Sequence, residues 1–452
     1  MNKKHSLVTG SIGKGLLYFV IPLILSSLVQ QLYVTVDSII VGRFAGKTAL
    51  AAIDSVHTLF KFPINFMNGL AAGANIIISR HYGEKRQDRL FVSVLAAGLI
   101  AALLGGVSSV VGAGMGGSLV TWMKVPENIR AQALGYTRIY FGGLWTLIIY
   151  NMAAGVLRSF GDSKSPLYIL LITSLVNIFG DLLFVAVFKW DVAGAAAATV
   201  LSQLLSAVMT VYLVYKKTAD LKNGSAQGIS NALIWPELSQ MAATGFPLAL
   251  QSILFPVANT IVQAAVNSMG TDSIAAWGIC DKLDMVIWLI ADSMSPALTT
   301  YTAQNIGAKK PERVSRGVFI GAAMSVGAVA VISAGLFVFT GTMSAWFIPE
   351  NDAASVVPLC VKYMYGMAPF FIFYAMAEAF SGACCGTGDT VKPMILTLIA
   401  TCLLRVVGIV FVLPFYENME CIVGIYVASW IVSGLCFMAL WLKKRTSFII
   451  EI

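Results

Sequence analysis

The chain has little charge and few of the residues that build metal and redox sites. Only 12% of its 452 residues are charged and 58% are hydrophobic, whereas a typical soluble protein is roughly 25% charged and 45–50% apolar. It has three scattered histidines, and its seven cysteines show no C-x-x-C spacing. A soluble enzyme, a nucleic-acid-binding protein, a histidine metal centre and a disulfide framework are therefore disfavoured. The sequence also lacks a P-loop motif, so we do not expect the chain to hydrolyse ATP by itself.

Long apolar runs recur along the whole sequence, without the period-two alternation of barrel strands. Each crossing of a bilayer needs roughly 20 apolar residues, because hydrocarbon satisfies no unpaired backbone group. We predict an all-α polytopic membrane protein with twelve transmembrane helices, at residues 14–42, 49–79, 90–114, 134–157, 166–188, 193–215, 239–268, 274–303, 316–340, 356–385, 393–416 and 422–442.

The positive charges divide unequally between the two sides that this topology defines. With both termini on one side, 20 of the 30 Lys and Arg lie in the loops of that side and 5 in the loops of the other. An excess of Lys and Arg marks cytoplasmic loops. We therefore predict a multi-pass protein of the plasma membrane with both termini in the cytoplasm, and we attribute the net charge of +8 to this topology.

The two halves of the sequence resemble each other. Four landmarks of the first half recur in the same order in the second half: Pro22–Ser27 as Pro247–Ser252, Gly46–Ala52 as Gly270–Ala276, Tyr82–Arg89 as Ile306–Arg313, and Gly161–Pro166 as Gly388–Pro393. Six predicted spans separate the copies, so both halves enter the membrane from the same side.

The repeat predicts two pseudo-symmetric lobes of six helices around a central cleft. We place the N-terminal lobe at residues 1–215 and the C-terminal lobe at 239–452. The longest polar stretch, residues 216–238, is the predicted cytoplasmic linker. Two equivalent lobes around one cleft are typical of transporters that expose a site to each face in turn.

Two aspartates of the first half, Asp37 and Asp181, fall within predicted spans at about the same depth. At ~1.5 Å per residue, each lies roughly 8 Å below the outer boundary of the bilayer core. Acids in lipid are costly, and two like charges close together destabilise each other unless a cation or a proton intervenes. Asn177 lies one helical turn before Asp181 on the same span, and neighbouring spans add Asn151 and Thr199, so that each contributes an amide or hydroxyl oxygen. This group of oxygens indicates a site for a hard cation or a proton.

These residues and their spacing resemble the multidrug and toxic compound extrusion (MATE) family. The resemblance rests on Val36–Gly42, the pair Asn177 and Asp181, Gly194–Thr199, and the two Gly-Asp-x-x-x-Pro loops, and it extends over essentially the whole chain. It implies twelve helices in two lobes and the export of organic cations and other drugs driven by inward Na⁺ or H⁺. It also implies a cation or proton site at Asp37, Asn151, Asn177, Asp181 and Thr199, with Na⁺ possible at all of these except Asn151.

The second half departs from the pattern that the resemblance suggests. One branch of the family carries an acid in span 7 and another in span 10. Here Phe246–Met269 contains no acid, and the only acid in span 10 is Glu378, about one turn from the expected position at Tyr374. We therefore expect coupling to depend on the first half.

Contact with the transported compound is expected on aromatic and methionine side chains, because these adapt to varied shapes and attract cations. Glu378 adds a carboxylate that could meet a cationic compound. The candidates for the cleft are Tyr33, Phe255, Trp277, Met285, Trp288, Tyr374, Met376 and Glu378.

The function that we predict is secondary antiport, in which organic cations leave the cell while Na⁺ or H⁺ enters. The expected partners are small organic molecules and the lipid bilayer, with no nucleic acid, no obligate protein partner and no cofactor besides the coupling ion. The alternative is a flippase for lipids or lipid-linked oligosaccharides, although few Lys and Arg lie within the spans. An enzyme is not expected, because no His or Cys arrangement supplies a nucleophile with its base.

Overall fold

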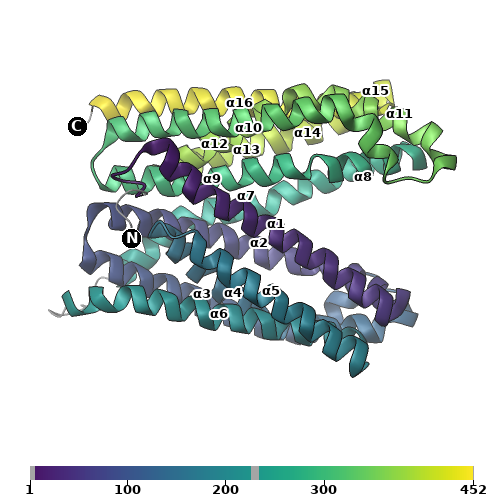
Figure 1. Cartoon of the computed structure of the whole chain (residues 1–452), viewed down its shortest axis with the longest axis horizontal. Helices are drawn as coiled ribbons and strands as arrows, with labels where there is room; N and C mark the ends of the chain where they lie inside the picture. Colours follow the sequence, from purple (N-terminus) through teal and green to yellow (C-terminus); the bar gives the residue numbers. More distant parts are fainter. Residues whose placement is uncertain (1–5, 225–233, 451–452) are drawn as a thin grey trace. The chain divides into compact units, whose positions relative to one another are not determined.

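Helix is the only regular secondary structure in the described residues of the computed structural model, which are 6–224 and 234–450. Figure 1 shows long helices running nearly side by side within each part of the chain. Residues 225–233 of the predicted linker lie outside the described residues, while its flanks belong to the helices before and after it.

The helices of the first half are long, and the last of them passes beyond its predicted span. They are α1 (Ile12–Phe44), α2 (Gly46–Glu84), α3 (Gln87–Trp122), α4 (Glu127–Ser159), α5 (Lys164–Asp181) with a π-helix at Leu182–Val187, and α6 (Asp191–Gly224).

The second half contains more breaks. Its helices are α7 (Ile234–Asn267), α8 (Thr271–Leu283), α9 (Met285–Gly307), α10 (Pro311–Ala345), α11 (Glu350–Met367), α12 (Phe371–Gly386), α13 (Val391–Thr397), α14 (Leu404–Val407), α15 (Leu413–Tyr416) and α16 (Met419–Ile450). A 3₁₀ turn joins α11 to α12, and π-helices at Leu398–Leu403 and Gly408–Val412 flank α14.

Each predicted span falls on a helix or on a run of consecutive helices, but in the described residues ten segments are long and apolar enough to cross a membrane. The two predicted spans that are not among the ten are 49–79 and 274–303. The first lies on α2, whose apolar stretch is interrupted by polar and charged side chains such as His57 and Lys61. The second is divided at Asp284 into α8, with 13 residues, and α9, which carries Asp292.

The chain forms two compact units. The N unit comprises Ile21–Ala249, and the C unit comprises the described residues up to Val20 together with those from Leu250 onward. Two helices are therefore shared: α1 begins in the C unit and continues in the N unit, while α7 begins in the N unit and continues in the C unit.

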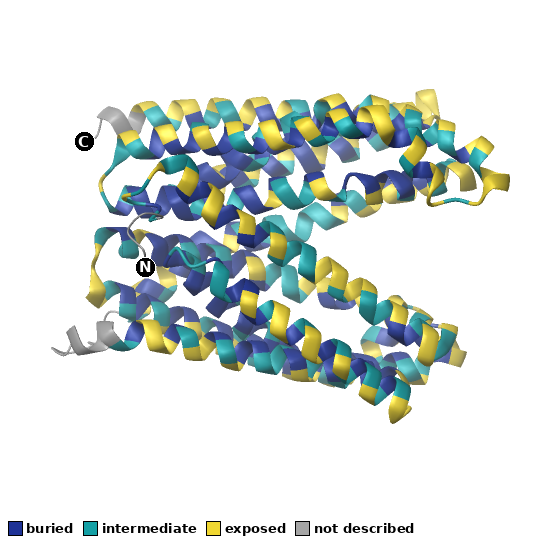
Figure 2. Ribbon diagram, viewed as in Figure 1, coloured by how far each residue is buried: buried dark blue, intermediate teal, exposed yellow. Residues whose placement is uncertain are grey.

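The two units use the same internal packing. In the N unit α4 packs against α2, α3 and α6, and in the C unit α12 packs against α9, α10 and α16. Buried residues gather in the interior of each unit, while exposed and half-buried residues occupy much of the outward faces (Figure 2). Each unit therefore buries one helix as its core, and large apolar side chains such as Leu103 and Val331 remain exposed as expected for a lipid-facing surface.

Backbone geometry follows the sequence repeat at equivalent loops. Lys85 ends α2 with φ 57° and Lys309 follows α9 with φ 55°, both in the left-handed region that few L-residues adopt. Gly161 and Gly388, which open the two Gly-Asp loops, have φ 79° and 93°, a conformation that favours glycine. The repeated sequence thus encodes repeated turns.

The two Gly-Asp loops also make the same contacts. Asp162 accepts hydrogen bonds from the backbone N–H and the hydroxyl of Ser165 at 3.0 and 2.6 Å, and it pairs with Lys217 near the end of α6. Asp389 accepts from the backbone N–H of Lys392 at 3.3 Å and pairs with Lys444 near the end of α16 at 2.8 Å. Each aspartate therefore caps one helix and ties it to the last helix of its half.

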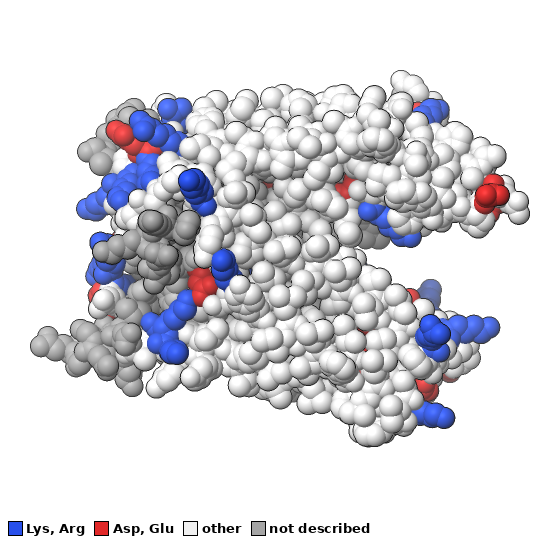
Figure 3. Space-filling model, viewed as in Figure 1, with Lys and Arg blue, Asp and Glu red and all other residues white. Residues whose placement is uncertain are grey.

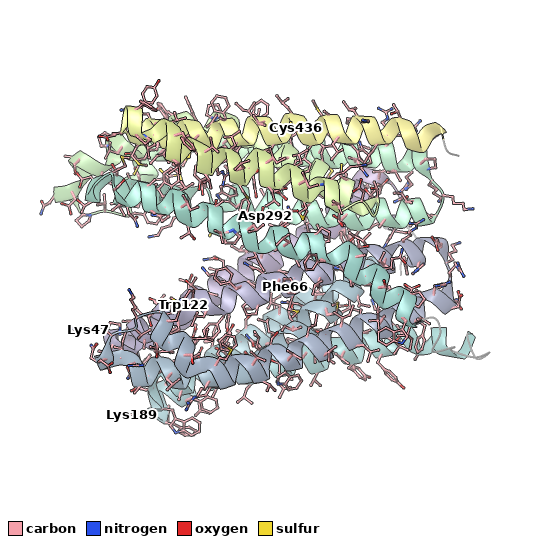
Figure 4. All side chains as sticks on the ribbon, turned by 180° about the vertical axis from the view of Figure 1, so that it is seen from behind. Lys47, Phe66, Trp122, Lys189, Asp292 and Cys436 are labelled. Carbon is pink, nitrogen blue, oxygen red and sulfur yellow. The ribbon has the colours of Figure 1, made fainter. Side chains whose placement is uncertain are left out.

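Charged side chains gather at the helix ends. Figure 3 shows a surface with few charged side chains along the helices. Lys47 and Lys189, which the predicted topology places in outer loops, lie at the same end of the N unit (Figure 4). A polar end and an apolar length are what a bilayer requires, so the chain is a membrane-embedded helical protein.

Candidate ion-binding site

The two predicted aspartates meet inside the N unit. Asp181, the last residue of α5, is fully buried, and its carboxyl group lies within hydrogen-bonding reach of that of Asp37 on α1. Both oxygens of Asp181 and Oδ1 of Asp37 are buried and accept no hydrogen bond from the described residues. Two ionised carboxylates cannot donate to each other, so this pair requires a proton or a cation between its members.

Asn177 extends the same group of polar atoms along α5. It precedes Asp181 by one helical turn, so both side chains occupy one face of the helix. It is 1% exposed, and neither its Oδ1 nor its Nδ2 has a hydrogen-bond partner among the described residues. Buried polar atoms without partners are rare in folded proteins because each costs desolvation free energy, so this cluster has the character of a ligand site.

Thr199 on α6 supplies a hydroxyl that is already in use. It donates to the backbone carbonyl of Ala195 at 2.9 Å and accepts a long hydrogen bond of 3.5 Å from the hydroxyl of Tyr33 on α1. A lone pair of the Thr199 oxygen is still free to bind a cation, because a hydroxyl oxygen has two acceptor positions. The structure therefore links Tyr33, predicted as a cleft residue, to the ion-site residue Thr199.

A change of helix type begins directly after Asp181. Residues Leu182–Val187 form a π-helix, which continues α5 with i→i+5 hydrogen bonds. Single turns of π-helix are rare and occur frequently at functional sites. The irregular turn thus follows the carboxylate that lacks partners.

Three further polar side chains border the site and were not predicted from the sequence. The hydroxyl of Tyr140 is hydrogen-bonded to Gln203, and the ring of Tyr140 stacks on that of Tyr136 with centroids 5.7 Å apart. Both tyrosines lie on α4, close enough to Asp37 for its charge to act on their hydroxyl groups. Their i,i+4 spacing was the available signal, because it places both rings on one face of the helix.

Asn151 has a different partner from the one that the predicted site implies. Its amide nitrogen donates to Oδ1 of Asn68 on α2 at 3.0 Å. The hydrogen bond joins α2 to α4, two helices that pack against each other. A share of Asn151 in ion binding stays a prediction.

The C unit holds an acid that the predicted site did not include. Asp292 lies within α9, away from its ends (Figure 4), and accepts a hydrogen bond of 2.5 Å from the hydroxyl of Tyr374 on α12. Tyr374 and Trp288, both predicted cleft residues, are in contact with ring centroids 4.4 Å apart. Glu378, one turn beyond Tyr374, is hydrogen-bonded by Ser295. The second half therefore brings two acids to the contact between α9 and α12, each with a donor.

Arg405 is a buried cation in the C unit with neutral partners. It is 1% exposed, and it donates to Oδ1 of Asn259 at 2.8 Å and to the hydroxyl of Ser429 at 2.9 Å. Its guanidinium lies 4.1 Å from the ring centroid of Tyr426 and 5.7 Å from that of Phe255, a predicted cleft residue. Its Nη2 atom has no partner among the described residues.

The remaining cleft candidates have different environments. Trp277 is 6% exposed and packs edge-on against Tyr426 with centroids 5.4 Å apart, in the apolar core of the C unit. Met285 and Met376 are half-buried. Their role in contacting a transported compound stays a prediction.

The arrangement in the N unit suits exchange of a small cation. Two carboxylates, the unpartnered amide of Asn177 and the hydroxyl oxygen of Thr199 offer the ligands that hard cations prefer, and the same carboxylates can share a proton. No group of three or more His, Cys, Asp or Glu that could hold a metal ion occurs in the part of the chain that the structure describes.

Comparison with known proteins identifies the family. The MatE family model matches residues 22–183 and 247–411. The chain is 26% identical over 454 residues to "Probable multidrug resistance protein YoeA" of Bacillus subtilis, covering 98% of this chain and 96% of that protein. It is 24% identical over 329 residues to the "FAD transporter" of Shewanella oneidensis, covering 71% of each chain.

The fold is also that of a solved transporter. The structure titled "Crystal structure of MATE in complex with MaL6" is similar with a TM-score of 0.88 at 19% identity, and 99% of each chain is covered. The family match takes in both repeats and includes Asp37 and Asp181. The chain therefore belongs to the MatE family, the multidrug and toxic compound extrusion transporters.

Proposed function

We propose that this protein exports small organic compounds, mainly cations, across the plasma membrane in exchange for inward Na⁺ or H⁺. The observation that carries the proposal is the buried pair of Asp37 and Asp181, beside an Asn177 whose amide has no partner. A site of this kind is stable only when a cation or a proton enters it. Family membership supports the transport activity, and the site supports ion coupling in the first half.

Exchange follows from the two states of the carboxylates. When an ion from outside neutralises Asp37 and Asp181, attraction for a positively charged compound weakens and the compound is released. When the site opens to the cytoplasm, the ion leaves and the carboxylates regain their charge. The membrane potential favours inward movement of each positive charge by ~2.3 kcal/mol per 100 mV.

The architecture that we propose has twelve membrane spans, with α2 and the α8–α9 run as spans besides the ten most apolar segments. Lobes 1–215 and 239–452 would enclose the cleft, with both termini in the cytoplasm. The cleft would take the compound against the aromatic and methionine candidates and Glu378. The coupling ion is the sole cofactor in this proposal, and the names of the relatives do not favour the flippase alternative.

Uptake into proteoliposomes under separately imposed Na⁺ and pH gradients tests the proposal. We expect a gradient of one ion to drive accumulation of an organic cation such as ethidium, and Asp37→Asn to abolish the gradient-driven part. Asp54→Asn is the matched control, because Asp54 is an exposed acid on α2. Full gradient-driven uptake by Asp37→Asn would contradict the proposal, as would stronger binding of lipid-linked sugars than of organic cations by the purified protein.

A second substrate class, organic anions, has one observation in its favour. Arg405 is a buried guanidinium that forms no ion pair with the described residues and has one unpartnered nitrogen, between two aromatic rings. One relative of this chain is named as a transporter of FAD, which is an anionic and aromatic compound. Competition between a flavin nucleotide and ethidium for uptake distinguishes the two classes, and Arg405→Met should weaken only the flavin if the second class is correct.

A further inference from the structure

Equivalent residues around the α2–α3 and α9–α10 connections contact the start of α7 and the residues just before α1, the two shared helices. The end of α2 and the first turns of α3 contact the beginning of α7, while the end of α9, Lys310 and the start of α10 contact the segment that leads into α1. Both held segments precede the point at which α1 or α7 passes to the other unit, at Val20 and at Ala249. We call the first contact the Glu237 clamp (Glu237 with His81, Arg89 and Ser93) and the second the Arg313 clamp (Arg313, Lys310 and Asn305 with Leu7–Gly10).

The Glu237 clamp consists of one buried carboxylate and three donors. Glu237, in the first turn of α7, is 1% exposed. It accepts hydrogen bonds from the hydroxyl of Ser93 at 2.9 Å and from the guanidinium of Arg89 at 3.2 Å, both on α3. His81, near the end of α2, contacts the same carboxylate at 3.3 Å and contacts Glu84 with its other ring nitrogen. All three donors therefore depend on a single group of α7.

Close backbone packing continues the contact along α7. A Cβ atom added to Gly73 on α2 would lie 2.3 Å from Cα of Gly245, so the two helices touch at glycine. The first turns of α7, from Glu237 to Gly245, are thus seated between the clamp and this contact. Beyond Ala249 the helix belongs to the C unit.

The Arg313 clamp is built from backbone carbonyls. Arg313 donates to the carbonyl of Leu7 at 3.2 and 3.1 Å and to that of Gly10 at 2.6 Å. Lys310 donates to the carbonyl of Val8 at 3.0 Å, and the buried Asn305 donates to that of Leu7 at 3.2 Å. The held segment accepts these hydrogen bonds through three backbone carbonyls. None of these carbonyls titrates or depends on a side chain of that segment.

The sequence repeat makes the two clamps equivalent. Arg89 and Arg313 occupy the same position in the repeated loop, and Lys85 and Lys309 give both loops the same left-handed turn. The difference lies in the held segment, which offers one carboxylate in the first clamp and several carbonyls in the second. Removal of the charge of Glu237 weakens two of its three contacts at once, because Arg89 and a protonated His81 are attracted by the charge.

We propose that the two clamps are paired but unequal anchors for the shared helices, and that the Glu237 clamp is the one that opens during the transport cycle while the Arg313 clamp stays closed. The anchors themselves are independent of the proposed function, whereas their opening during a cycle rests on it. Two experiments separate these parts.

Hydrogen–deuterium exchange of the full-length protein in lipid nanodiscs tests the anchors. Glu237→Gln should speed exchange of residues 238–245 by about tenfold or more, as expected for the loss of a charged hydrogen bond, and leave residues 12–20 unchanged. Arg313→Gln should act on residues 12–20 and not on 238–245. Asp88→Asn is the control, because this exposed neighbour of Arg89 lies outside the clamp. Equal effects of both variants on both segments, or no effect, would overturn the proposal.

Reversible cross-linking tests which clamp opens. A short bifunctional methanethiosulfonate would join Ser93→Cys to Glu237→Cys across the first clamp, or Val8→Cys to Lys310→Cys across the second, in a chain whose exposed Cys436 is replaced. The first link should stop uptake until a reductant is added, and the second should leave uptake unchanged. Unimpaired uptake with the first link, or arrest with the second, would overturn the opening step. Absence of uptake in the unlinked wild type would instead contradict the proposed function.

Discussion

Asp181 of the N unit and Asp292 of the C unit have different surroundings. In the N unit, Asp181 and Asn177 are buried without any hydrogen-bond partner among the described residues. In the C unit, Asp292 is paired with Tyr374 and Arg405 is held by Asn259 and Ser429. A group that already has partners needs no ligand, whereas an unpartnered carboxylate does. The contrast supports our proposal that the exchangeable ion binds in the first half.

The repeat sharpens this contrast, because α5 and the run α13–α15 follow equivalent Gly-Asp loops. The first carries Asp181 and the second carries Arg405, and π-helix lies beside both residues. One architecture thus presents a negative charge without hydrogen-bond partners in one half, and in the other a positive charge with two of its three nitrogens hydrogen-bonded.

Among the substitutions that test this contrast, Asp181→Asn should cause the largest loss of ion-driven uptake. It removes the charge from the fully buried member of the pair, so ion-driven uptake should fall by at least about 100-fold, equivalent to ~2.7 kcal/mol. Uptake under imposed Na⁺ and pH gradients measures the loss, and thermal unfolding shows that the variant is folded. A folded variant that retains gradient-driven uptake would contradict the assignment of coupling to the N unit.

Arg405→Lys should affect stability rather than coupling. Lysine keeps the charge but cannot reach Asn259 and Ser429 with a planar fork, and it stacks less well on Tyr426. We expect the free energy of unfolding to fall by about 2–3 kcal/mol, with an unchanged dependence of uptake on the ion gradient. Denaturant unfolding in detergent gives the first quantity. An altered ion dependence at normal stability would show that the C unit takes part in coupling.

Asp292→Asn should change little, because Tyr374 can donate to an amide oxygen as well as to a carboxylate. The concentration of coupling ion that gives half-maximal uptake should shift by less than about threefold, or ~0.65 kcal/mol. Asp54→Asn provides the baseline. A loss as large as that of Asp181→Asn would mean that both halves bind the ion.

Substitutions in the two Gly-Asp loops, where the halves make equivalent contacts, should have the smallest effects, and these should be on stability. Burial raises the pKa of Asp162, but hydrogen bonds from Lys217 and Ser165 outweigh it and hold this pKa below the ordinary value. Burial likewise raises the pKa of Asp389, but the contacts with Lys444 and Lys392 outweigh burial and hold this pKa below the ordinary value. Both contribute stability above about pH 4 that is lost as the pH falls through the lowered pKa.

Asp162→Asn and Asp389→Asn should therefore each lower the free energy of unfolding by about 1 kcal/mol near neutral pH. The difference from the wild type should vanish in acid, since the wild-type carboxylates are then protonated. Unfolding measured from pH 3 to pH 7 checks both variants. Unequal losses would show that the two loops have diverged in role.

Much of the fold could be predicted from the apolar runs and the repeat. Each predicted span falls on helical residues, because hydrophobic length is a strong signal. The break at Asp284 was not predicted, since no proline or glycine adjoins it. The π-helices were not predicted either, because an i→i+5 turn has no simple sequence pattern.

The site was predictable only where charge in lipid made residues conspicuous. Asp37 and Asp181 could be paired because their depths along two spans match, and the structure brings them together. Tyr140 and Gln203 were missed because depth does not tell which face of a helix a side chain occupies. Glu237 and Arg89 were missed because a pair 148 residues apart depends on tertiary packing.

Direct ion binding to the purified protein tests the central claim. Calorimetric titration with NaCl at fixed pH, and with acid at fixed salt, should reveal saturable binding of one of the two ions to the wild type. Binding should disappear in Asp37→Asn and Asp181→Asn and persist in Asp292→Asn. Saturable binding that survives in folded Asp181→Asn but is lost in Asp292→Asn would place the ion in the second half and contradict the account.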